Sequence, residues 1–272
     1  MREWITVSVD TDRDISSIEF GRSFIEGLIA IDDGRLAPEF FNSHEPINRS
    51  FAIEGIDAAL KLWGKGLSIR RRRSPQMLMM VEPGPPEAIK YKRFPWYCIA
   101  SISSTKFEEQ AEKLHRYLAH VISPGYGRTT LDSEIVEKHY FEINESDGGI
   151  LQRYVGTVPE TQIPSVYWLT YLGPWAIEMI GRNRIETLPV GEVERIDEGY
   201  LIKAYPHLKQ SGTPEAHAAE ESIKDHLGRH HFFDRSQVDI EKLKNPPHVE
   251  KAIREAAEKM KAEGKKSTTL EI

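Results

Sequence analysis

The clearest pattern of hydrophobic and polar positions lies in residues 165–189, which read SVYWLTYLGPWAIEMIGRNRIETLP. Residues 165–171 alternate and are rich in β-branched and aromatic side chains, as is typical of a buried strand. Gly173 and Pro174 end that strand, and the fixed φ of proline suits the first turn of a helix. The pattern predicts a helix of about two turns and then a second strand over residues 184–188. Nothing in the segment is chemically reactive, so we interpret it as a packing centre.

Similar patterns predict the elements on either side of this segment. Alternation indicates strands over residues 4–9, 67–69, 77–81, 96–101 and 139–143, and a late hairpin of residues 191–196 and 200–204. Two capping boxes, in which Ser16 or Thr105 is followed three positions later by glutamate, predict the starts of two helices. Further helices are predicted around residues 56–62, 213–227 and 246–261.

The order of these elements predicts the fold class. Helices separated by pairs of strands favour an α+β fold, with helices packed on a largely antiparallel sheet and two C-terminal helices after it. We expect an α+β domain over residues 1–208 and a helical extension over residues 209–272, because the composition changes near residue 210. Tryptophan in or beside three of the predicted strands leaves a strand–helix duplication open, although no fixed period supports it.

Composition and charge narrow the classes of function. The chain of 272 residues has a formal net charge of -6, which disfavours a general nucleic-acid binder because phosphate contacts need a basic surface. Its single cysteine, Cys98, can form no internal disulfide, which favours a reducing compartment. No stretch approaches the roughly 18 apolar residues of a membrane span. We therefore expect a cytoplasmic protein that binds neither nucleic acid nor a membrane directly.

Two groups of residues match parts of metal-dependent active sites. Asp10, Asp12 and Asp14 follow a strand, as the aspartates of haloacid-dehalogenase-like phosphatases do, but those enzymes have a parallel sheet. His226 and His230 have a spacing that can bind zinc, yet the residue after His226 is not the glutamate of a metalloprotease motif. A metal-dependent hydrolase that uses Asp10 and Asp12, or His226 and His230, remains an alternative function.

Two further groups carry charge without a complete motif. One loosely resembles part of a restriction-type nuclease site, although it falls in one short segment rather than on adjacent strands: Asp132, Glu134, Glu137 and Lys138. The other is the arginine run of residues 70–73, which at a hairpin end favours edge protection or pairing with carboxylates. We therefore expect no enzyme, and neither a cofactor nor a metal.

The residues of the packing centre also carry a family resemblance. It rests on Tyr167, Trp168, Leu172, Gly173, Pro174 and Gly181, together with the N-terminal strand and helix and the WYCIAS strand. Over about residues 1–208 the chain resembles the immunity protein 52 family of bacterial toxin systems. The resemblance implies a protein of type VI secretion systems that binds a restriction-endonuclease-like nuclease toxin and neutralises it stoichiometrically, without catalysis.

Acidic loops are the natural docking elements for such a toxin, because a DNA-cutting partner should carry the opposite charge. The candidate partner-binding residues are Glu145 and Asp147 in one turn, and Glu192, Glu194, Asp197 and Glu198 on the late hairpin. An interaction module of another system, which docks through its C-terminal helices, is a further alternative.

Overall fold

The structure is a computed structural model, and it describes residues 3–83, 94–144, 149–156, 162–240 and 243. Contacts divide the chain into two compact units. The first comprises Met1–Lys138 and Gly156–Phe233, and the second comprises His139–Val155 and Asp234–Ile272. The expected domain boundary at residue 208 and the strand–helix duplication stay predictions.

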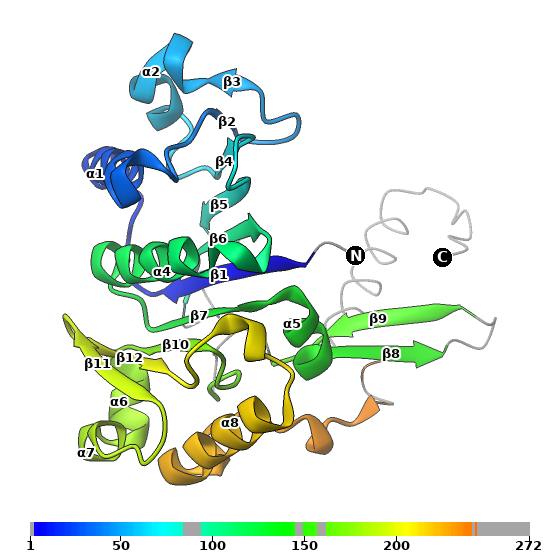
Figure 1. Cartoon of the computed structure of the whole chain (residues 1–272). Coiled ribbons are helices and arrows are strands. Elements are labelled where there is room, and N and C mark those ends of the chain that lie inside the picture. Colours follow the sequence, from blue (N-terminus) through cyan, green and yellow to red (C-terminus); the bar gives the residue numbers. More distant parts are fainter. Residues whose placement is uncertain (1–2, 84–93, 145–148, 157–161, 241–242, 244–272) are drawn as a thin grey trace, which may run out of the picture. The chain divides into compact units, whose positions relative to one another are not determined.

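A ten-stranded antiparallel sheet forms the centre of the first unit (Figure 1). From one edge to the other its strands are β11 (Glu192–Ile196), β12 (Gly199–Lys203), β10 (Leu169–Leu172), β7 (Tyr126–Leu131), β1 (Trp4–Thr11), β6 (Trp96–Ser103), β5 (Met77–Pro83), β4 (Leu67–Arg71), β2 (Phe40–Asn42) and β3 (Arg49–Ser50). Each neighbouring pair is antiparallel. The predicted α+β fold class is therefore confirmed.

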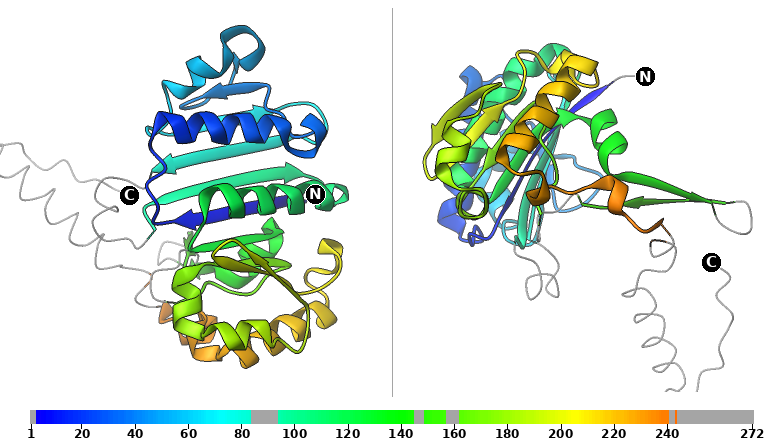
Figure 2. Two further views of the ribbon diagram at one scale, coloured as in Figure 1. Left: turned by 90° about the vertical axis from the view of Figure 1, so that its left-hand side faces the viewer. Right: turned by 90° about the horizontal axis from the view of Figure 1, so that it is seen from below.

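Among its described residues, the first unit has the helices α1 (Ile18–Ala30), α2 (Phe51–Leu60), α4 (Glu108–Ile122), α5 (Asp132–His139, whose last residue falls in the second unit), α6 (Pro174–Ile180), α7 (Arg182–Glu186) and α8 (Pro214–Leu227). Single turns of 3-10 helix are η1 (Ile31–Gly34), η2 (Thr105–Phe107), η3 (Leu208–Gln210) and η4 (Arg229–His231). Helices α1 and α4 lie on the same face of the sheet (Figure 2). Within the described residues, no helix is both long and apolar enough to cross a membrane.

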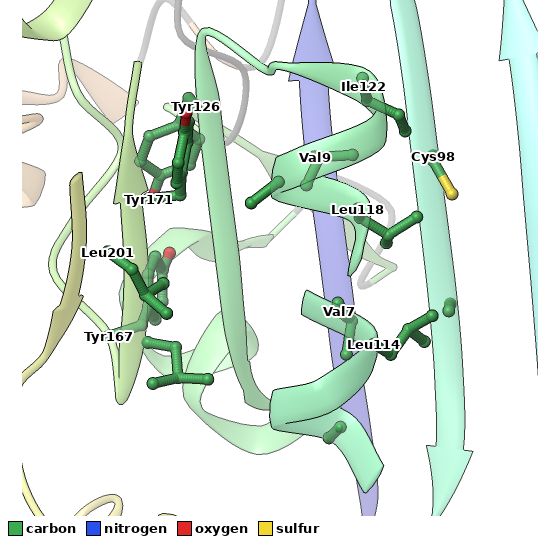
Figure 3. Close-up of a cluster of buried hydrophobic side chains, with 14 of the residues drawn as sticks. Val7, Val9, Cys98, Leu114, Leu118, Ile122, Tyr126, Tyr167, Tyr171 and Leu201 are labelled. Carbon is green, nitrogen blue, oxygen red and sulfur yellow. The ribbon is translucent and has the colours of Figure 1, made fainter. Parts of the chain in front are cut away.

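The core forms where α4 packs on the central strands. Figure 3 shows Leu114, Leu118 and Ile122 of α4 turned toward β1, where Val7 and Val9 point at the helix. All five side chains are completely buried. Cys98 on β6 is also buried, and this burial raises the pKa of its thiol. The cysteine therefore behaves as a small core residue.

In the second unit, β8 (Tyr140–Asn144) and β9 (Ile150–Tyr154) pair as a separate two-stranded antiparallel hairpin. The rings of Tyr140 and Tyr154 meet edge to face, with their centroids 4.3 Å apart. The guanidinium of Arg235, in the turn η5 (Arg235–Gln237), lies 4.1 Å from the ring centroid of Phe141. Such aromatic and cation–π contacts stabilise a hairpin that would be marginal alone.

Two local predictions are wrong. Residues 184–188 do not form a strand, because α7 occupies that position and β10 already has β7 and β12 as its two neighbours. Strand β10 therefore has no free edge for another strand. Ile185 is buried instead as part of helix α7. The capping residues also differ from those expected. Helix α4 begins at Glu108, after the turn η2, without a side-chain cap.

The N-cap of α1 is Ser17 rather than Ser16, because the Ser17 hydroxyl accepts the backbone N–H of Phe20 at 3.1 Å. We expect Ser17→Ala to lower the free energy of unfolding by about 1 kcal/mol, since an orphan donor of the first turn loses its acceptor. Thermal and urea unfolding measure the change. Ser16→Ala is the matched control, and an equal effect of both substitutions would contradict the assignment of the cap.

Candidate functional site

Strands β11 and β12 form an acidic hairpin at one edge of the ten-stranded sheet, with β11 outermost. Its register pairs Glu192 with Lys203 at one end and Ile196 with Gly199 at the turn. Asp197 has a left-handed φ of 49°, a conformation that aspartate tolerates better than most residues. Strand β12 is largely buried, whereas the candidate residues of β11 and the turn are exposed: Glu192, Glu194, Asp197 and Glu198.

Helix α4 pairs with two of these four carboxylates. Arg116 forms an ion pair with Glu194, and His120 Nδ1 donates to Asp197 at 2.7 Å. Behind them, Glu112 accepts hydrogen bonds from Arg116 at 2.8 Å and from Lys203 at 3.0 Å. Burial opposes the ionisation of Glu112, but these two cations outweigh it and hold the pKa of Glu112 below its ordinary value. The hairpin is therefore fixed to α4 by charge.

The other candidate carboxylates differ in what the structure says about them. Neither Glu192 nor Glu198 has an ion pair within the described part of the chain, so both carry unneutralised charge on the surface. Glu145 and Asp147 lie outside the described residues. The structure thus brings Glu192, Glu194, Asp197 and Glu198 together, and it leaves two of these four side chains free for a partner.

A pocket of about 470 Å³ lies beside the hairpin turn. Five separate segments of the described chain meet there: the end of β1, the residues before β6, the loop after α4, the start of α6 and the turn between β11 and β12. Its lining includes Asp12, Arg13, Phe94, Trp175 and Glu198, together with the backbone around Gly125. Sequence reasoning missed this pocket, because its walls come from positions far apart in the chain.

A second cluster of charge is buried between α5 and α8. Lys138 forms an ion pair with Glu134 and donates to Glu220 at 2.7 Å and to the carbonyl of Val166 at 2.8 Å. Glu134 also accepts hydrogen bonds from Thr130 and Ser211. Burial raises the pKa of Glu220 to about 8, although Lys138 partly opposes the shift. For Glu134, burial acts in the same direction, but Lys138 and the two hydroxyls outweigh it and lower the pKa.

This buried cluster contains part of the group that resembles a nuclease site in the sequence. Its members point to different neighbours: Asp132 accepts from Thr6, Glu137 lies 3.7 Å from His217, and Lys138 holds two glutamates. The arrangement joins elements of the fold rather than forming an open site.

The residues of the hydrolase alternative are also held apart. Asp10 lies in β1, opposite Tyr97 and Tyr126, whereas Asp12 lines the pocket. His226 Nε2 donates to the carbonyl of Arg184 at 2.9 Å, and the ring of His230 packs against His231. Within the described ranges, no group of three or more His, Cys, Asp or Glu side chains is arranged to hold a metal ion. Among the described residues, the metal-dependent hydrolase therefore has no set of metal ligands.

No protein-family model and no curated protein matches the chain. Among solved structures it is similar to one described as a Pseudomonas aeruginosa type VI secretion system protein, PA0821. The two chains share 14% sequence identity with a TM-score of 0.52, over 83% of this chain and 72% of the other. At this identity the likeness shows a shared fold, and the resemblance to the immunity protein 52 family is not confirmed.

Proposed function

We propose that this chain is a cytoplasmic immunity protein of a bacterial type VI secretion system, which neutralises a cognate nuclease toxin by stoichiometric binding. The observation that carries the proposal is the fold it shares with a type VI secretion system protein, over 83% of the chain. The likeness alone assigns no activity. The sequence resemblance and the geometry of the acidic hairpin support the narrower role.

The acidic hairpin suits a basic partner in two respects. Its carboxylates lie together at the edge of the sheet, and the net charge of -6 gives the chain a sign opposite to that of a DNA-binding surface. Complementary charge increases the rate of association and disfavours wrong partners. The ion pairs to α4 hold the hairpin in place before binding, which reduces the entropy lost on association.

Co-expression in a sensitive host tests the proposal directly. We expect this chain to protect cells against the toxin encoded by the adjacent gene, with intact DNA and a complex that survives pull-down. Cells that die with degraded DNA, in the presence of well-expressed and folded chain, would overturn the proposal.

A titration separates binding from catalysis. When purified toxin at a fixed concentration receives increasing amounts of this chain, its nuclease activity should fall in proportion and reach its minimum near one equivalent. A small fraction of an equivalent that inactivates all of the toxin over time would instead indicate an enzyme. The outcome of this titration therefore decides between the proposed inhibitor and an enzymatic antitoxin.

A further inference from the structure

We propose that the pocket beside the hairpin turn receives a lysine or arginine side chain of the toxin. The inference rests on the proposed function, and it adds the chemistry of the anchor that the toxin inserts. The pocket volume of about 470 Å³ lies within the range of roughly 300–1,000 Å³ that is usual for ligand sites. One long basic side chain and its bound waters fit into such a space.

The described residues that line the pocket carry an excess of negative charge. Asp12 and Glu198 both line it, and neither forms an ion pair within the described part of the chain. Arg13 is the one cation among the described lining residues, but its guanidinium is engaged elsewhere. It donates to the carbonyl of Val121 at 3.4 Å and lies 5.4 Å from the ring centroid of Phe20. The two carboxylates outnumber this guanidinium, so the described lining has one negative charge in excess with which to bind a cation.

Aromatic rings supply the second part of the recognition. Phe94 and Trp175 both line the pocket, with ring centroids 5.5 Å apart and an interplanar angle of 77°. The face of an indole attracts a cation, and the aliphatic stem of lysine or arginine packs well against aromatic rings. An acidic rim with aromatic walls therefore favours a basic side chain over a small anion or a purely apolar group.

Backbone contacts hold the pocket in one shape. The N–H of Gly125 donates to the carbonyl of Asp10 at 2.9 Å, and the N–H of Gly173 donates to the carbonyl of Gly125 at 3.0 Å. The approach is so close that a Cβ on Gly173 would lie 2.0 Å from the carbonyl oxygen of Pro124. Because three segments are joined there, the site exists before a partner binds, and binding needs little rearrangement.

Substitution of the two carboxylates tests the proposal in the complex. We expect the Asp12→Asn, Glu198→Gln double variant to bind the toxin 10- to 100-fold more weakly, as measured by calorimetry or surface plasmon resonance, in the range of one lost charge-assisted anchor. The Glu19→Gln, Glu215→Gln double variant is the matched control, because it removes the same charge from exposed residues of α1 and α8, outside both the hairpin and the pocket lining. Equal affinities of the Asp12→Asn, Glu198→Gln variant and the wild-type chain would overturn the proposal.

A second experiment tests, in the absence of the toxin, whether the pocket binds a basic group. N-acetyl-L-arginine methylamide is titrated into the full chain while the indole N–H resonance of Trp175, assigned with Trp175→Phe, is followed by NMR. We expect a saturable shift that the uncharged citrulline analogue and the Asp12→Asn, Glu198→Gln variant do not show. No shift, or the same shift with citrulline, would overturn the pocket. A failed toxin complex with a positive probe result would instead contradict only the proposed function.

Discussion

Lys138→Met is expected to lower the free energy of unfolding by about 3–5 kcal/mol, because it leaves the buried carboxylate of Glu134 without its cation. The Lys138 side chain is 13% exposed, and those of Glu134 and Glu220 are 3% or less. Methionine has a similar length and adds no charge, so the loss reports on the ion cluster rather than on a cavity. Urea unfolding at pH 7, followed by circular dichroism, measures the difference.

The control for this prediction is the same substitution at Lys224. The Lys224 side chain is also 13% exposed, but its partner Glu221 is 46% exposed, so water can solvate the carboxylate after the change. Ion pairs of this kind contribute about 0–1 kcal/mol. A similar loss in Lys224→Met and Lys138→Met would contradict the buried cluster as the cause.

The sequence predicts most of the sheet where strands alternate. Strand β1, the β4–β5 hairpin, β6 and the β11–β12 hairpin all fall where the pattern of hydrophobic positions places them. In β1 the alternation has a direct physical cause, because Val7 and Val9 face α4 whereas Thr6 and Ser8 lie on the other face. The packing centre is also confirmed, since Tyr167, Trp168 and Tyr171 are almost completely buried.

Strand β7 shows why the sequence did not predict every strand of the sheet. Its sequence, YGRTTL, is polar, yet all six residues are buried between β1 and β10. Its two threonines form hydrogen bonds with side chains outside the strand. Thr129 Oγ1 lies 2.6 Å from His115 Nδ1 of α4, and Thr130 donates to Glu134 of α5. A local pattern cannot reveal a buried strand whose stability depends on tertiary hydrogen bonds.

The sequence likewise predicts one part of the candidate site and not the other. The acidic residues of the hairpin could be identified from the sequence, because an exposed edge strand and its turn are local features. The pairing of Arg116 with Glu194 could not, since 78 positions separate them. The pocket could not be predicted either, because Asp12 and Glu198 line the same pocket only after the sheet is assembled. The sequence therefore predicts where the charges occur, and the fold determines which of them remain free.

The buried cluster also predicts a pH dependence of stability that Glu220→Gln should remove. The pKa of Glu220 is raised to about 8 from 4.5, mainly by burial. The folded state thus holds this proton more tightly than the unfolded state. The stability that protonated Glu220 contributes is therefore complete below pH 4.5 and is lost as the pH rises toward 8. Relative to Glu220→Gln, the wild-type chain should lose on the order of 2 kcal/mol between pH 6.5 and 8.

The range from pH 6.5 to 8 separates the effect of Glu220 on stability from that of His115, which has the opposite dependence on pH. Burial lowers the pKa of His115 from 6.5 to about 3, so the stability that His115 contributes is present above pH 6.5 and is lost as the pH falls toward 3. Urea unfolding of both proteins at several values between pH 6.5 and 8 therefore isolates the glutamate. Parallel stability curves for the wild-type chain and Glu220→Gln would contradict a protonated Glu220 beside Lys138. They would indicate that Lys138 keeps both glutamates ionised in the folded state.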